Sequence, residues 1–181
     1  METLTEARPL VPNPNYGLDR QEALEGLRAE LAKGSIDEPT IDVLEQFARL
    51  PCCYTLQSCY GHFMIEPCVE DRNAKRVVDI GGTGTTLHYR IAYIAFCIQD
   101  SAQGRALLEE LKAVAGIDSD YIQFGSADWF WKMCANSYVL QVSPRRSAYE
   151  DSCEVDKEDA LRIERARDEF FEKLRQVLLT R

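Results

Sequence analysis

The stretch that decides the fold is Arg90-Ile91-Ala92-Tyr93-Ile94-Ala95-Phe96-Cys97-Ile98, an apolar run rich in β-branched and aromatic residues. Such a run predicts a central strand, because these side chains fit a pleated, buried surface. An amphipathic helix follows, capped by Asp100 and ended by Gly116. The order of strand, helix and further strands predicts an α+β domain with a largely antiparallel sheet covered by helices. The further strand candidates are residues 121–124, 129–133 and 138–142.

The other predicted elements lie on both sides of this core. Residues 1–16 carry Pro9, Pro12 and Pro14, which predict an extended arm on the surface. Residues 17–181 are expected to form a single α+β domain, closed by a long helix that Asp156 starts and whose apolar stripe faces the sheet. Between them we expect helices at 20–33 and from an Asp37 cap to Leu50, strands at 53–56 and 62–65, and a long loop at 66–86 with a strand candidate at 76–80.

Composition limits the possible environments and partners. The first thirty residues hold Glu2, Glu6 and Asp19 where a signal peptide needs a basic start, and no apolar run is long enough for a membrane span, so we expect a cytoplasmic protein. Seven scattered cysteines predict reduced, mostly buried thiols. A net charge of −9 speaks against DNA and non-specific phosphate binding.

A local surface could still contact RNA. Two basic clusters are candidates for such a patch, although each is also typical of solvated loop charge. Trp129 and Trp131 would share one face of a strand, where they could stack on a base, while Phe130 would face the core. The basic clusters are Arg72, Lys75 and Arg76, and Arg145 and Arg146.

The strongest candidate site is the turn Tyr54-Thr55-Leu56-Gln57-Ser58-Cys59-Tyr60-Gly61-His62, which presents hydroxyl, thiol and imidazole groups within a few residues. These groups could form a nucleophile with its base, or an anion site built from turn N–H groups. The pattern is equally typical of a tight turn in which Gly61 supplies backbone freedom and Cys59 belongs to the core.

This turn and the segment before it resemble the wybutosine-synthesis methyltransferases, which methylate a tricyclic guanine derivative in phenylalanine tRNA. That family has a stretch similar to Lys33-Gly34-Ser35-Ile36-Asp37-Glu38, then a motif aromatic-Thr-x-Ser-Ser-Cys-x-Gly-Arg, matched here by Tyr54, Thr55, Ser58, Cys59 and Gly61. The chain departs from it where His62 replaces the motif Arg and Gln57 its first Ser. A later Ser-Thr-His-Gly of the family has a partial counterpart at residues 136–139.

The resemblance implies an S-adenosylmethionine-dependent methyltransferase that acts on a modified RNA base or a similar small substrate. It places Ser58 and His62 in the catalytic role. It places Thr55, Cys59 and Gly61 around the cofactor. His88 and Arg90 share one face of a predicted strand, and if that face meets the Ser58 turn they would join the cofactor site as a base and an anion clamp. The alternative is a non-catalytic relative that binds a small ligand or a metal.

Two further patterns in the sequence resemble other kinds of site. Residues 77–85 look like the glycine-rich first motif of Rossmann-type methyltransferases, but a strand pattern follows the glycines where that motif needs a helix, so we expect a hairpin loop. Cys59, His62, Cys68 and His88 offer soft ligands for zinc. They contain one Cys-x-x-His pair and no second clear pair, so the sequence predicts a site without metal.

Overall fold

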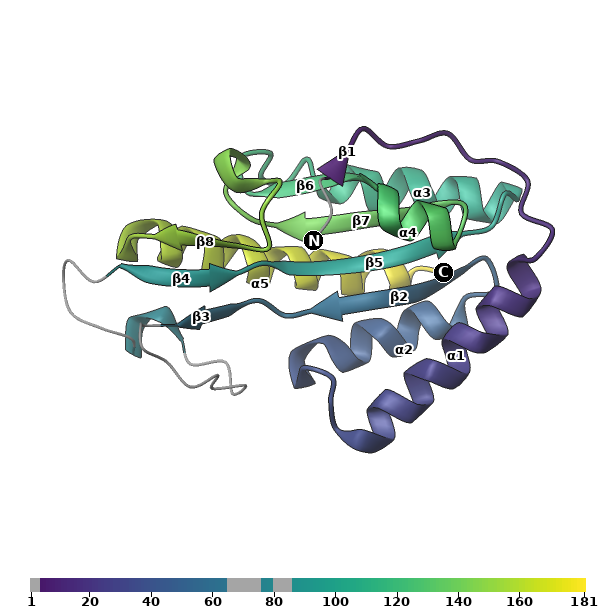
Figure 1. The fold of residues 1–181 in the computed structure, drawn as a ribbon, viewed down its shortest axis with the longest axis horizontal. Helices are drawn as coiled ribbons and strands as arrows, with labels where there is room; N and C mark the ends of the chain where they lie inside the picture. The colour runs from purple at the N-terminus through teal and green to yellow at the C-terminus, as the bar shows by residue number, and fades with distance from the viewer. Residues whose placement is uncertain (1–3, 65–75, 80–85) are drawn as a thin grey trace.

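The computed structural model describes residues 4–64, 76–79 and 86–181 (Figure 1). It confirms the α+β class, with antiparallel sheets and a long C-terminal helix. The α-helices are α1 (Tyr16–Lys33), α2 (Ile41–Arg49), α3 (Ala102–Val114), α4 (Asp128–Met133) and α5 (Lys157–Leu179). The strands are β1 (Leu4–Thr5), β2 (Cys53–Cys59), β3 (His62–Met64), β4 (Leu87–Arg90), β5 (Ala92–Ile98), β6 (Ile122–Ala127), β7 (Ser137–Val142) and β8 (Ser152–Val155).

Two sheets are joined end to end. The larger has the order β1-β6-β7-β5-β2 and the smaller β3-β4-β8. The predicted central strand is split between them at Ile91, with every residue of β5 buried. At the split, the Tyr89 hydroxyl donates to Val142 O at 2.9 Å and accepts from Ala92 N–H at 2.9 Å. This buried pair of hydrogen bonds connects β4 of the smaller sheet to β5 and β7 of the larger sheet at their junction.

Helices cover both faces of the larger sheet. Figure 1 shows α5 running behind both sheets and α4 lying in front. On one face, Phe47 of α2 stacks on Phe96 of β5, with ring centroids 5.6 Å apart. On the other face, Tyr16 of α1 packs on Tyr54 of β2 at 5.4 Å. α1 and α2 both contact β2, and the connection between them lies close to the end of that strand, where Asp37 accepts a hydrogen bond from Tyr60 N–H.

The segment from 129 to 133 is a helix and not the predicted strand. Asp128 lies in the first turn of α4, and a helical turn points Phe130 inward while Trp129 stays 52% exposed. Trp131 packs edge-on against Tyr138, so the two tryptophans do not share a face. β-Propensity reflects packing more than backbone preference, and here the tertiary contacts of α4 with β6 and β7 decide the conformation.

Other boundaries also differ from the sequence predictions. The strand candidate at 76–80 is a 3-10 helix at Val77–Asp79, where Val77 is buried and its N–H donates to Glu164 at 3.0 Å. β8 was not predicted, because only four residues alternate between exposed and buried positions. α1 begins four residues earlier than expected, and Ser101 instead of Asp100 caps α3. The Asp156 cap of α5 is confirmed.

The N-terminal segment before α1, described from residue 4 on, lies along the sheet. β1 pairs with the edge strand β6. Further on, Arg8 O accepts from the Tyr138 hydroxyl at 2.9 Å, and Asn136 exchanges two hydrogen bonds with the backbone of Val11. This segment therefore protects the edge of β6 from other strands.

The buried cysteines match the expectation from composition. Cys52, Cys53, Cys97 and Cys134 are each less than 9% exposed, as expected for thiols beside apolar strands. In the described part of the chain, no helix is both long and apolar enough to cross a membrane.

Candidate functional site

The turn between β2 and β3 is held in an unusual conformation by Gly61. Its φ is +87°, in the region that favours glycine. A Cβ at this position would lie 2.9 Å from the backbone N and Cβ of Ala92 and 2.9 Å from the Tyr89 hydroxyl. Glycine is therefore required here, and the tight turn fixes where Cys59 and His62 lie.

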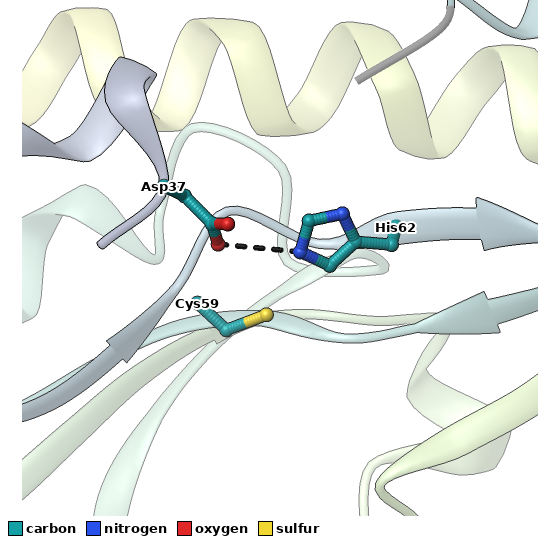
Figure 2. A group of neighbouring side chains, drawn as sticks. All are labelled: Asp37, Cys59 and His62. Atoms are coloured by element: carbon teal, nitrogen blue, oxygen red, sulfur yellow. Dashed lines mark hydrogen bonds and ion pairs between the residues drawn. The ribbon is translucent and has the colours of Figure 1, made fainter. Parts of the chain in front are cut away.

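Asp37 joins the turn from the connection between α1 and α2. It stands where the sequence predicted a helix cap, but its side chain makes no capping hydrogen bond to the described residues of that helix. Its carboxylate accepts from Tyr60 N–H at 2.7 Å and lies 3.2 Å from His62 Nε2 (Figure 2). Asp37 thus holds the N-cap position of the 3-10 helix Glu38–Thr40, as predicted, but its carboxylate does not cap that helix because a longer-range contact occupies it.

The Asp37 carboxylate and the His62 ring perturb each other. The hydrogen bond to Asp37, helped by Cys59, raises the pKa of His62 to about 9 against the opposing effect of burial. Burial would raise the pKa of Asp37, but the hydrogen bonds from His62 and from Tyr60 N–H outweigh it and lower that pKa. At neutral pH the two groups are a carboxylate and an imidazolium.

Arg167 of α5 supports the turn from behind. It is 4% exposed, donates to Gly61 O at 3.3 Å, and its guanidinium lies 4.2 Å from the centroid of the Tyr60 ring. Glu164, one turn earlier on α5, lies 3.8 Å from it. Sequence reasoning missed this pair, although both residues fall on the buried stripe of the last helix, where a charged side chain signals a specific partner.

A cavity of about 700 Å³ lies between α1, β2 and α4. Asp37, Thr55 and Ser58 line it, and Tyr54, Trp129 and Phe130 supply aromatic walls. A second cavity of about 460 Å³ shares Gln57, Trp129 and Phe130 with the first and extends to Arg90 and Asp151. Asp19, Glu22 and Glu30 of α1 add carboxylates to the larger cavity.

The structure separates the predicted site residues into three groups. Thr55 and Ser58 line the larger cavity. His62, which was expected to act together with Ser58, is not among the residues that line this cavity and faces Asp37. Cys59, Gly61 and His62 meet at the turn, and Arg90 pairs with His62 across β3 and β4. His88 lies further along β4, where its ring is 3.7 Å from Glu154. Cys68 and the glycines at 81, 82 and 84 are outside the described residues.

Comparisons with known proteins identify the fold. The chain is similar to the PH1069 protein from Pyrococcus horikoshii, with 18% identity, a TM-score of 0.50, and coverage of 91% of this chain and 92% of that one. A second structure of PH1069, from Pyrococcus horikoshii OT3, gives 16% identity, a TM-score of 0.51, and coverage of 92% and 93%. A hypothetical protein from Aeropyrum pernix matches at 15% identity and a TM-score of 0.41, over 78% of this chain and 97% of that one.

At these identities the PH1069 structures show a shared fold. No protein-family model and no curated protein matches the chain. The function must therefore be argued from the site itself.

Proposed function

We propose that this protein is an S-adenosylmethionine-dependent methyltransferase acting on a modified guanine base or a similar small molecule. One observation carries the proposal: the two stretches that resemble the wybutosine-synthesis methyltransferases meet in space. Asp37 of the first stretch contacts Tyr60 and His62 of the second. Asp37 also lines the large cavity, together with Thr55 and Ser58 of the second stretch.

The larger cavity suits the cofactor in size and charge. Its volume of about 700 Å³ falls within the usual range for small-molecule sites. S-adenosylmethionine has a net positive charge, from a sulfonium and an ammonium group against one carboxylate, and the carboxylates of Asp19, Glu22 and Glu30 could hold its cationic groups. Trp129, whose side chain is largely exposed, offers a ring face for the adenine or for the sulfonium charge.

The residues of the chain would act mainly by positioning. When bound, S-adenosylmethionine supplies an electrophilic methyl group, and transfer then depends on how closely the acceptor atom is held to it. The Thr55 and Ser58 hydroxyls line the cavity and can donate to or accept from a base edge. His62 acts through Asp37, whose carboxylate it orients, so we assign it a positioning role.

The charge of the cavity favours a small substrate over intact tRNA. Among the described residues that line it, four are acidic and none is Lys or Arg. A phosphate backbone would be repelled at such a mouth. Of the candidate basic patches, Arg146 is bound to Asp159 at 2.5 Å, and Arg72 and Lys75 lie outside the described residues. A non-catalytic protein that binds a small cationic ligand is the second candidate that this charge supports.

The test combines binding with methyl transfer. Stability is measured with and without S-adenosylmethionine or its demethylated product, since a ligand at 100 times its dissociation constant should add about 2.7 kcal/mol. Glu22→Gln should weaken this effect, because Glu22 lines the cavity. Glu25→Gln, an exposed acid one turn away on α1 that lies outside the cavity lining, should leave it unchanged.

Transfer of a labelled methyl group is then followed on a tricyclic guanine nucleoside and on tRNA. We expect the nucleoside to be the better acceptor. Binding without transfer to either acceptor would favour the non-catalytic candidate. Absence of any stabilisation by the cofactor and its product would contradict the proposal.

We also propose that the protein works in a reducing compartment, the cytoplasm. The six cysteines that the structure describes are free thiols and all are buried. Disulfides form and persist mainly in oxidising compartments, so free buried thiols support this location.

A further inference from the structure

Three side chains at the turn offer ligand atoms to a common point. The carboxylate of Asp37, the Sγ atom of Cys59 and a ring nitrogen of His62 all lie within 4.8 Å of one another (Figure 2). They come from the connection after α1, the end of β2 and the start of β3. Cys59 is buried, while the Asp37 and His62 side chains keep 20% and 17% of their surface exposed. The cluster is therefore shielded but can be reached from solvent.

We propose that Asp37, Cys59 and His62 bind a divalent transition-metal ion such as Zn²⁺. In the described part of the chain these three side chains make up the ligand set, which leaves a fourth coordination position for water or substrate. Thiolate, imidazole and carboxylate are the protein ligands of zinc, and three of them with one open position are typical of reactive zinc sites. This inference goes beyond the proposed methyltransferase activity, which requires no metal. The sequence showed only a Cys-x-x-His pair; the fold adds Asp37, which lies 25 positions before His62.

The distances within the cluster suit tetrahedral coordination. Two ligand atoms bonded to zinc at about 2.0–2.1 Å are separated by about 3.3 Å at the tetrahedral angle. His62 Nε2 and Asp37 Oδ2 are 3.2 Å apart, so an ion could replace their hydrogen bond without moving either side chain far. A thiolate at about 2.3 Å from zinc lies about 3.6 Å from the other ligands, within reach of a small rotation of the Cys59 side chain.

The charge of the ligand groups and the hydrogen bonds that they accept also favour a cation here. A carboxylate and a thiolate together carry two negative charges, which balance the two positive charges of a divalent ion. Tyr60 N–H donates to the Asp37 carboxylate at 2.7 Å, and Gly61 N–H donates to Cys59 Sγ at 3.4 Å. Such hydrogen bonds orient metal ligands. Arg167 holds the same turn through Gly61 O, so the ligands are attached to a supported loop.

The test measures metal binding directly. The whole chain is stripped with a chelator and titrated with Zn²⁺, and with Co²⁺ to detect thiolate coordination from its near-ultraviolet charge-transfer band. We expect one ion per chain. Loss of an outer-shell contact alone typically weakens metal binding 10–100-fold, so Cys59→Ser or His62→Gln should weaken it by about 100-fold or more.

The chain provides a matched control for each variant. His88→Gln alters the second of the two histidines, on β4, and Cys153→Ser alters another buried cysteine, on β8. Both should bind zinc like the unchanged protein. If Cys59→Ser does not fold, as judged by circular dichroism of the metal-free protein, Asp37→Asn replaces it, because the amide keeps the size of the carboxylate and one acceptor oxygen.

Two results would overturn the metal site: no stoichiometric zinc binding by the unchanged protein, or equal affinity in the ligand and control variants. The first would leave the cluster as an Asp37–His62 ion pair. The titration contains neither S-adenosylmethionine nor substrate, so its failure leaves the methyltransferase proposal standing. Conversely, zinc binding without any effect of S-adenosylmethionine would retain the metal site and reject that proposal.

Discussion

Replacing Gly61 with alanine tests whether the turn between β2 and β3 is as constrained as its geometry indicates. A non-glycine residue at a φ of +87° costs about 1–2 kcal/mol. The new Cβ would also lie 2.9 Å from the backbone N of Ala92 and 2.9 Å from the Tyr89 hydroxyl, and crowding of a packed interior costs about 1–3 kcal/mol. Gly61→Ala should therefore lower the free energy of unfolding by about 2–5 kcal/mol.

Replacing a helical glycine with alanine provides a control in which the free energy of unfolding should change in the opposite direction. Gly26 lies within α1, and a Cβ there would meet no described atom within 4 Å. Gly26→Ala should stabilise the protein by about 0.5–1 kcal/mol, because alanine loses less entropy in a helix. Urea unfolding followed by circular dichroism measures both variants. A change of less than about 0.5 kcal/mol for Gly61→Ala would refute the view that glycine is required at the turn.

Three further predictions concern the charges and thiols around the site. In metal-free protein, the pKa of His62 at about 9 exceeds the ordinary 6.5, so its pairing with Asp37 stabilises the fold fully below pH 6.5 and is lost as pH rises through about 9. The difference between the two pKa values corresponds to about 3.4 kcal/mol, which partial exposure of the pair reduces to about 1–2 kcal/mol of stability. If the free energy of unfolding depended on pH in the same way in the unchanged protein and in His62→Gln, this prediction would be contradicted. Arg167→Leu should destabilise the protein by about 3 kcal/mol, because it leaves Glu164 buried without its cationic partner, with Val77 N–H still donating to it. Its exposed neighbour provides the control Arg165→Leu, which should stay within about 0.5 kcal/mol; equal effects in urea unfolding would refute a special role for the buried pair. Thiol labelling should be slow in the native protein and complete on unfolding, because all six described cysteines are buried; rapid labelling of all seven without unfolding would show otherwise.

The candidate site was found from sequence only in part. The turn at residues 54–62 stands out because hydroxyl, thiol and imidazole groups gather within nine residues. Asp37 was noticed as a helix cap, since an Asp before an apolar periodic segment is the usual sign of one. Its true partners are Tyr60 and His62, more than twenty residues away. Arg167 gave a weaker signal, as a charge among the apolar positions of the last helix.

The sequence by itself determined the elements whose signal is local. The apolar run around β5 and the stripe of α5 with its Asp156 cap each depend on neighbouring residues, and the structure confirms them. Tertiary structure decided the helical state of residues 128–133 and the contact between Asp37 and His62. The physical reason is that periodicity and capping reflect interactions over a few residues, whereas these two features depend on which distant segments the sheet brings together.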